Sequence, residues 1–354
     1  MKEIKSNTAL KTVPLKAAKT KTMTKTIRIV RADKMSTALK ALIARVESAA
    51  VRGAEKYFQE QGFVWVPSVP HIVSVTGACE NVNTLYDVDY HGKEAFLTQT
   101  GQTALEEMTQ GIERVCTIIH SFRKEESVDN RHLTEFPLVE FEFRYDPEKE
   151  DGFELLLHHI ECTIIAMIKN ILAIEKTALQ ELGVDCTRLE KLGAPFKRIS
   201  YTESVELLGL KWGEDLKSTN ETKLMEMHGE VPVFVTRYPT KIKFFNMQQN
   251  KDEPEIVNSA DLLLPPGGEA VGSAVREHNY EKLISRLDKS EMMRILREKG
   301  KDLKDFESYT NLVRDNPVPH AGCGIGLNRV MQFILNEQDI RKSTPYPMNK
   351  EILY

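Results

Sequence analysis

Apolar residues recur at the spacing of an α-helix along four stretches of this chain. The first covers residues 36–61, and Gly62 follows as a residue that commonly ends a helix. Its apolar positions are Leu39, Leu42, Ile43, Val46, Ala50, Ala54 and Phe58. Residues 153–182 carry a longer amphipathic pattern, and residues 280–299 and 327–336 carry shorter ones. These patterns predict helices that each bury one face.

Strand signals lie between the helical stretches. Residues 63–66, 114–122 and 319–324 are short runs typical of strands. From residue 139 to residue 144, one valine and two phenylalanines alternate with Glu140, Glu142 and an arginine, which predicts a strand with one buried face. A charged loop precedes it. Helices and antiparallel-looking strands follow one another without regular βαβ alternation, so the predicted fold class is α+β.

Composition narrows the class of protein. The 354 residues include 28% charged side chains and give a formal net charge of -4, which argues against attraction of the whole protein to nucleic acid. No uninterrupted apolar run approaches the length of a membrane span, and the N-terminus lacks the apolar core of a secretory signal. The five cysteines form no CxxC pair. We therefore expect a cytoplasmic protein with reduced thiols and no membrane contact.

Residues 1–35 form a basic segment with few acids and little apolar periodicity. This composition predicts a largely disordered arm. Two interpretations of the arm remain open. It is either a solvated tail or an arm that contacts RNA phosphates, because clustered lysines and arginines bind them through counterion release.

Three later segments gather charged residues near predicted strands. Residues 122–136 contain FRKEES and RHLTEF, and arginine suits bidentate contact with phosphate. Residues 261–276 hold two acids around a Gly-rich bend, where carboxylates are natural magnesium ligands. Residues 320–329 place glycines before a helix that opens with an arginine, which favours anions. The chain has neither a GxxxxGK[ST] loop nor a GxGxxG fingerprint after a strand, so these common loops do not hold a nucleotide.

Taken in this order, the segments resemble the class II aminoacyl-tRNA synthetases of the aspartyl and asparaginyl subgroup. The helix at residues 36–61 and the stretch up to Pro67 resemble motif 1, FRKEES with RHLTEF resembles motif 2, and GIGLNR resembles motif 3. The resemblance covers residues 36–354. It implies a class II catalytic domain with an antiparallel sheet flanked by helices, ATP and Mg2+ as cofactors, and a homodimer formed through motif 1.

The resemblance also assigns residues to ATP. Arg123 would hold the α-phosphate and stabilise its charge, and Glu125 would lie near the adenine and the amino acid. Phe136 would stack on one face of the adenine, while Arg329 would cover the other face and contact the γ-phosphate. The further ligands would be Arg131 and His132 for the outer phosphates, and Asp261 and Glu269 for the magnesium ions.

For the amino acid, the resemblance implies Glu80 and Gln102 at the α-amino group and Arg276 at the side-chain oxygen. The letters QTALE that begin at Gln102 resemble the QLYLE of asparaginyl enzymes, whereas aspartyl enzymes carry a lysine where Leu105 stands. Glu106 would accept from an amide NH2 and repel a second carboxylate, so asparagine or a close analogue fits better than aspartate. A lysine at Leu105 would turn the preference toward aspartate. In the alternative interpretation, Leu105 and Glu106 are an ordinary helix start and do not select the substrate.

Several positions depart from the family pattern. Residues 79–84 replace a CEGAGE loop, Val275 stands at a usually polar position, and Asn328 stands where an acid is common. Residues 1–35 lack the alternating strands of the anticodon-reading OB-fold of asparaginyl enzymes, so we do not expect tRNA to be bound through its anticodon.

We therefore predict an ATP-dependent ligase that forms an aminoacyl-adenylate and passes it to an unusual acceptor. This acceptor would be ammonia, a small amine, a peptide, or a tRNA engaged by its acceptor arm alone. The alternatives are an aspartate–ammonia ligase related to asparagine synthetase, a tRNA-charging enzyme that uses the basic arm, and a regulatory paralogue without catalysis.

Overall fold

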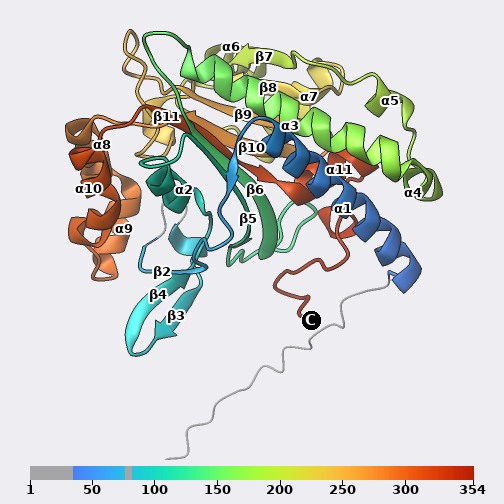
Figure 1. Ribbon diagram of the computed structural model, residues 1–354, viewed down its shortest axis with the longest axis horizontal. Coiled ribbons are helices and arrows are strands. Elements are labelled where there is room, and N and C mark those ends of the chain that lie inside the picture. Colours follow the sequence, from blue (N-terminus) through green and yellow to red (C-terminus); the bar gives the residue numbers. More distant parts are fainter. Residues whose placement is uncertain (1–34, 76–81) are drawn as a thin grey trace, which may run out of the picture.

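The computed structural model describes residues 35–75 and 82–354, and an eight-stranded sheet lies at its centre (Figure 1). In spatial order its strands are β1 (Val64–Trp65), β5 (Arg114–Phe122), β6 (Glu135–Arg144), β11 (His320–Gly326), β10 (Gly268–Val275), β9 (Ser259–Leu264), β8 (Val233–Thr236) and β7 (Lys197–Ser200). The two outermost pairs are parallel, and all other neighbours are antiparallel. The predicted α+β class with an antiparallel sheet is confirmed.

A smaller sheet of three strands stands beside the large one. Its order is β2 (Ile72–Val73), β4 (Lys93–Leu97) and β3 (Asp87–Tyr90), all antiparallel. The β3–β4 hairpin projects away from the rest of the fold (Figure 1). Glu80 and Cys79 lie outside the described residues, so the predicted role of Glu80 is not placed by this structure.

The helices are α1 (Thr37–Glu60), α2 (Gln102–Met108), α3 (Gly152–Ile174), α4 (Lys176–Glu181), α5 (Thr187–Glu190), α6 (Tyr201–Leu208), α7 (Ser218–Met227), α8 (Tyr280–Lys289), α9 (Glu291–Glu298), α10 (Glu307–Asp315) and α11 (Leu327–Leu335). Side chains cap the N-terminal ends of α1 and α3. Ser36 accepts from the Leu39 N–H (3.2 Å) at the start of α1, and Asp151 accepts from the Phe153 N–H (2.9 Å) at the start of α3.

Two predicted helices are each divided in two. The helix predicted over residues 153–182 breaks at Glu175, which separates α3 from α4. The helix predicted over residues 280–299 breaks at Ser290, whose hydroxyl accepts from the Met293 N–H (3.1 Å) and so caps α9. A side-chain acceptor offers the backbone an alternative to helix continuation, which the apolar periodicity alone does not report.

The main core lies between one face of the large sheet and the helices α1 and α3. Val139, Phe141 and Phe143 of β6 point into it, together with Cys323 and Ile325 of β11. α3 is long and apolar enough to pass for a membrane span by length and composition, but Leu156, Ile160 and Ile164 are fully buried in this core. Its hydrophobicity therefore serves packing. The four cysteines among the described residues are free thiols.

The opposite face of β6 differs from the prediction. Alternation predicted that Glu140 and Glu142 would face water, yet both are fully buried. The prediction of a single buried face was wrong, because elements distant in sequence cover the polar face as well. α2 and α10 contribute side chains there, and the two glutamates hydrogen-bond within the protein. A buried carboxylate is tolerated only with such partners.

Candidate active site

A strip without bulky side chains crosses this second face of the sheet. On β11, Gly322, Gly324 and Gly326 alternate with the core-facing residues and therefore share the other face. On β10, Gly272 pairs with Gly324, and Ala274 pairs with Gly322. Every predicted site residue on the sheet flanks this strip or lies at one of its ends. We call it the glycine strip.

Three predicted site residues lie at one end of the strands, where β5 and β11 end and where β6 and β10 begin. We call this end of the sheet its edge. Arg123 directly follows β5, Glu269 is the second residue of β10, and Arg329 lies in the first turn of α11, just after β11. The antiparallel register brings all these strand ends to one edge. Residues separated by more than 200 positions in the chain thus become neighbours along this edge.

Arg123 and Phe136 contact each other at this edge. The Arg123 N–H donates to the Thr134 carbonyl (2.9 Å), which closes the base of the charged loop. Its guanidinium lies over the Phe136 ring, 5.6 Å from the centroid. Among the described residues, no group accepts from the buried Nε of Arg123. A buried cationic donor without a partner is suited to an anionic ligand.

Arg131 and Arg329 meet at the turn between β9 and β10. Arg131 donates to the carboxylate of Glu221 on α7, and Arg329 donates to the Gly267 carbonyl. Burial and the nearby charge of Arg131 lower the pKa of Arg329 to about 10. The charge of Arg131 disfavours the charged form of Arg329, whereas the carboxylates of Glu221, Glu269 and Asp129 favour it.

Two further predicted ligands of the same loop are more exposed. His132 is exposed and lies with Nδ1 2.8 Å from Asp129 Oδ2. Glu125 is half-buried, and its N–H donates to the Arg123 carbonyl (2.8 Å). Both side chains belong to the charged loop rather than to the face of the sheet.

The two predicted metal ligands share one face of the sheet. Asp261 of β9 pairs with Gly272, and a register shift between Glu269 and Val271 turns Glu269 toward the same face. A Cβ built on Gly272 would lie 3.4 Å from Glu269 Oε1, so this carboxylate reaches over the glycine strip. Lys243 Nζ lies 2.7 Å from Asp261 Oδ2 and neutralises its charge. Oxygen donors of this kind fit Mg2+. Within residues 35–75 and 82–354, no three His, Cys, Asp or Glu side chains cluster as a metal site.

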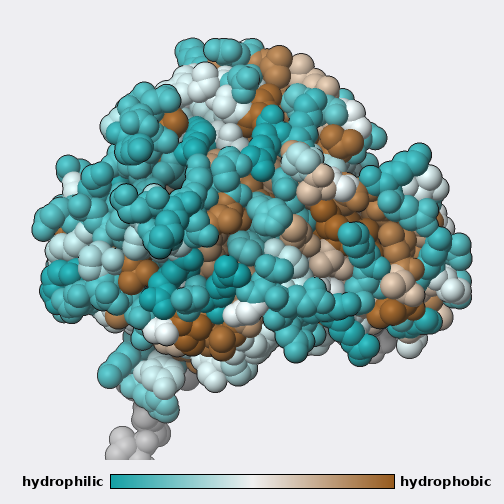
Figure 2. All heavy atoms as spheres, turned by 45° about the horizontal axis from the view of Figure 1, so that its top comes forward, coloured by the Kyte–Doolittle hydropathy of each residue, from teal (hydrophilic) through white to brown (hydrophobic). Residues whose placement is uncertain are grey.

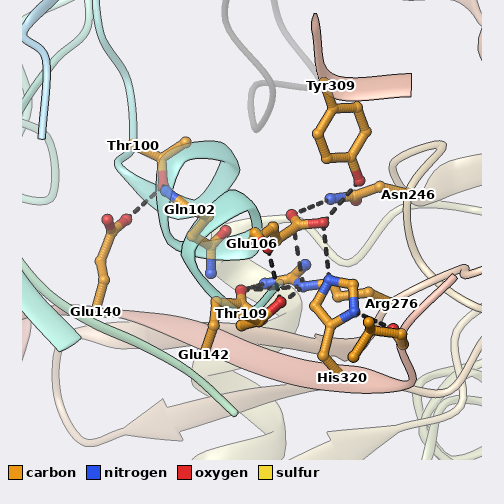
Figure 3. A network of polar contacts seen from close by, with 11 residues as sticks. Thr100, Gln102, Glu106, Thr109, Glu140, Glu142, Asn246, Arg276, Tyr309 and His320 are labelled. Atoms are coloured by element: carbon orange, nitrogen blue, oxygen red, sulfur yellow. Dashed lines mark hydrogen bonds and ion pairs between the residues drawn. The ribbon is translucent and has the colours of Figure 1, made fainter. Parts of the chain in front are cut away.

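At the other end of the glycine strip, Arg276 lies in a buried polar network (Figure 3). Its Nη2 donates to Glu142 Oε1 (2.6 Å), and its Nε lies 3.1 Å from the same oxygen. Burial alone would lower the pKa of Arg276, but the charges of Glu142 and Glu106 raise it. Gln102, in the amide orientation that satisfies both of its ends, accepts from Arg276 Nη2 (2.9 Å) and from the Gly324 N–H (3.1 Å).

Glu106 is the centre of this network (Figure 3). It accepts from Asn246 Nδ2 (2.8 Å), from the Tyr309 hydroxyl (2.7 Å) and from His320 Nε2 (3.2 Å). Burial alone would raise the pKa of Glu106, but the His320 hydrogen bond and the Arg276 charge outweigh it and lower the pKa. With three donors already bound, Glu106 holds its neighbours in place, and little acceptor capacity remains for a ligand.

Leu105 lies outside this network. It is fully buried in a small apolar cluster on the other side of α2. The members of that cluster are Val69, Leu105, Val115, Ile119 and Leu138. The neighbouring side chains on α2 therefore face two different environments, one polar and one apolar.

Sequence reasoning missed several residues of the site. Glu221, Asn246, Tyr309 and Lys243 come from segments in which no chemistry was predicted, and only His320 belongs to a segment that was singled out. A single acid on a short helix gives no local signal of its partner, even where Leu224 and Met225 share its buried face. Glu140 and Glu142 of β6 did give a local signal, because they alternate with core residues. That alternation, however, predicted that they face solvent.

Comparisons with known proteins agree on one family. Residues 19–350 match the family described as tRNA synthetases class II (D, K and N). An asparagine–tRNA ligase of Thermococcus gammatolerans is 35% identical over 321 residues, which cover 89% of this chain and 70% of that protein. The asparagine–tRNA ligase of Desulforamulus reducens is 34% identical over 319 residues, with 88% and 70% covered.

Solved structures give the same result. The crystal structure of asparaginyl-tRNA synthetase from Pyrococcus horikoshii complexed with asparaginyl-adenylate has a TM-score of 0.80 and 33% identity, and the match covers 90% of this chain and 70% of that one. The asparaginyl-tRNA synthetase of Entamoeba histolytica in complex with asparaginyl-adenylate has a TM-score of 0.75 at 26% identity, with 89% of this chain and 68% of that one covered.

Proposed function

Because this chain belongs to the class II tRNA synthetases, a family of ATP-dependent ligases, we propose that it joins the carboxylate of an amino acid to the α-phosphate of ATP. The glycine strip is the observation that carries this proposal. It has Arg123 and Arg329 at one end and Arg276 at the other. Gly326 and Gly322 are four strand residues apart, about 13 Å. This length suits an amino acid lying in line with a nucleotide.

At the first end, we assign Arg123 to the α-phosphate and Phe136 to one face of the adenine. Arg329 covers the other face, and Arg131 with His132 contacts the outer phosphates. Support comes from the shared sheet edge, the stacking of Arg123 on Phe136, and the two guanidiniums at the turn. We also assign Glu125 to a place near the adenine and the amino acid.

Asp261 and Glu269 would hold Mg2+ over Gly272. Bound there, the ion would supply positive charge to the phosphate oxygens. The ion pair of Lys243 with Asp261 already stabilises that carboxylate as an anion, the form that a metal needs. The lysine also fixes the position of the Asp261 carboxylate.

The reaction requires no covalent nucleophile from the protein. An oxygen of the substrate carboxylate forms a bond to the α-phosphorus, the bond from that phosphorus to the bridging oxygen of the β-phosphate breaks, and pyrophosphate leaves with the bonding electrons. Arg123 stabilises the charge on the α-phosphate oxygens in the transition state. The residues at the two ends of the glycine strip align the substrate carboxylate with the α-phosphate, and this alignment supplies the rest of the rate acceleration.

At the second end, we assign Gln102 to the substrate α-amino group and Arg276 to its side-chain oxygen. Glu80 would add a contact to the α-amino group from outside the described residues. Glu106 acts by holding Arg276 and His320. A neutral side chain such as that of asparagine fits beside three buried carboxylates better than a charged aspartate does. The substrate is therefore asparagine or a close analogue.

The acceptor is a separate question from activation. We propose an acceptor other than an anticodon-bound tRNA, namely ammonia, a small amine, a peptide, or a tRNA held by its acceptor arm. Charging of tRNA with asparagine is the second candidate, and it is favoured by the names of the relatives. We place the activity in the cytoplasm, which suits the free thiols.

Exchange of labelled pyrophosphate into ATP, run with each of the twenty amino acids, tests the activation step. We expect exchange with asparagine and little with aspartate. Arg123→Ala and Arg329→Ala should each lower the rate by about 100-fold or more, because each removes a charged donor from the phosphates.

Arg294→Ala serves as the matched control, since Arg294 is exposed on α9 and, among the residues that the structure describes, forms ion pairs only with acids of its own helix. It should leave exchange unchanged. Full exchange in either Arg123→Ala or Arg329→Ala would refute the site, and a protein that binds ATP but exchanges with no amino acid would favour the regulatory alternative. Charging of unfractionated tRNA with labelled asparagine then separates a tRNA acceptor from ammonia, a small amine or a peptide.

We also propose a homodimer formed through α1 and β1. Leu39 on α1 and Trp65 on β1 are 37% exposed, and Ile174 at the end of α3 is 51% exposed. Apolar side chains gather toward the right of Figure 2, the end of the molecule where α1, α3 and α4 lie. Exposed apolar surface of this kind marks an interface.

A further inference from the structure

Glu221 is a buried acid on α7, where it shares the buried face of the helix with Leu224 and Met225. Its side chain is 10% exposed, whereas Thr222, Lys223 and Glu226 of the same helix are exposed. α7 packs against β9 and β10, so Glu221 reaches the turn that joins these strands. Among charged residues, such burial requires a specific partner.

One oxygen of Glu221 has two donors. Oε2 accepts from Arg131 Nη2 and from the Glu269 N–H (3.2 Å). Between these donors lies Gly268, at φ +83°, where any Cβ would collide with the Arg131 guanidinium and the Glu221 carboxylate. The turn therefore leaves room for this ion pair only because residue 268 is a glycine.

Arg131 keeps donors that Glu221 does not use. Its Nε is buried, and across the part of the chain that the structure describes nothing accepts from it. Arg329 lies close enough to Arg131 for their charges to interact. A hydrogen bond to the Gly267 carbonyl holds Arg329 at the same turn. The Glu221 carboxylate thus fixes one side of the Arg131 guanidinium, and the N–H at Nε is suited to donate to a second anion.

We propose that Glu221 is a positioning residue that holds Arg131 for the outer phosphates of ATP, a role that rests on the proposed function. Glu221 stays bound to Nη2 in the nucleotide complex, while the remaining N–H groups of Arg131 turn to the β- and γ-phosphates. A guanidinium fixed beforehand loses less conformational freedom when the phosphate binds. The helix α7 thereby becomes part of the nucleotide site, although it carries none of the synthetase motifs.

Comparison of ATP with AMP tests this role without turnover. AMP lacks the outer phosphates, so a residue that acts through Arg131 affects ATP binding alone. In calorimetric titrations with Mg2+, we expect Glu221→Gln to weaken ATP binding by about tenfold, the size of one charge-assisted hydrogen bond, and to leave AMP binding within about twofold. Glu226→Gln, an exposed acid of the same helix, is the matched control and should change neither affinity.

A double-mutant cycle with Arg131→Ala checks that the effect passes through the arginine. In that background, Glu221→Gln should cause no further loss of ATP affinity. Glu221→Asp, which keeps the charge on a shorter side chain, should recover part of the loss.

Each other outcome is also informative. Equal losses for ATP and AMP would make Glu221 a structural residue and overturn the proposal, as would unchanged ATP binding. Tighter ATP binding in Glu221→Gln would mean that the carboxylate competes with the phosphates, which also contradicts it. An unaltered protein that binds no ATP would refute the proposed function as well, whereas ATP binding that is insensitive to Glu221 would refute only this inference.

Discussion

Burial of the Glu140 carboxylate makes the stability of the protein depend on pH. Thr100 and the Gly101 N–H (2.7 Å) donate to its two oxygens, and it is fully buried beside Gly324. Burial raises the pKa of Glu140 to about 7, although the hydrogen bonds oppose this shift. The folded chain therefore keeps this proton to a higher pH than the unfolded chain does. The contribution of Glu140 to stability is present at low pH and is lost as the pH rises through about 7.

Glu140→Gln should remove this pH dependence, because glutamine resembles the protonated acid. The free energy of unfolding of the unaltered protein, relative to the variant, should fall by about 3 kcal/mol between pH 5 and pH 8, at about 1.4 kcal/mol for each unit of pKa difference. Urea denaturation at several pH values measures it. Parallel stability profiles for the two proteins would show that Glu140 does not titrate in this range.

Leu105 illustrates a specificity hypothesis that the tertiary structure changes. Lysine at this position was expected to turn the preference toward aspartate, but the Leu105 side chain lies in the apolar cluster below α2. Leu105→Lys should therefore destabilise the protein by about 2–4 kcal/mol, since it buries a charge without a partner.

Denaturant unfolding of Leu105→Lys and of the size-matched Leu105→Met measures this effect. The methionine variant should lose about 1 kcal/mol or less. A lysine variant that is fully stable and prefers aspartate would restore the original hypothesis.

At the scale of elements, the closeness of α1 and α3 depends on Gly53. A Cβ on Gly53 would lie 2.5 Å from the Ala166 carbonyl oxygen and 2.7 Å from the Met167 Cα, which are backbone atoms of α3. Alanine would gain about 1 kcal/mol of helix propensity, but the overlap with a fixed backbone costs more.

Gly53→Ala should therefore lower the free energy of unfolding by about 2 kcal/mol, measured by urea denaturation. Gly111→Ala is the control, because a Cβ on Gly111 would meet nothing within 4 Å. If Gly53→Ala were neutral or stabilising, the two helices would have room to separate, and the close approach would not be needed for stability.

At the scale of the whole molecule, the proposed dimer depends on exposed apolar side chains of α1 and β1. Leu39→Glu and Trp65→Glu together should shift the protein from twice the monomer mass to the monomer mass, because buried charges without partners oppose association. Sedimentation velocity measures this change. Tyr90→Glu, at an exposed site on the β3–β4 hairpin, is the control. An unaltered protein that sediments as a monomer would contradict the proposal.

The sequence by itself determined several local elements and the candidates for the chemistry. The predicted strand at residues 114–122 is β5, the helix at residues 36–61 is α1, and the α+β class is confirmed, because apolar periodicity and capping residues act over short distances. Arg123, Arg329 and Glu269 could be named because they lie in short motifs with family resemblance. The basic arm lies outside the described residues, and its role stays a prediction.

Only the tertiary structure decided what those residues contact. Burial of Glu140 and Glu142, the place of Leu105 below α2, and the pairing of Glu221 with Arg131 all depend on segments far apart in the chain. A single β-bulge turned Glu269 toward Asp261. The physical reason is that burial and the strength of a charge are properties of the surroundings, which the antiparallel register and the packing of α2 and α7 create, and no local pattern encodes them.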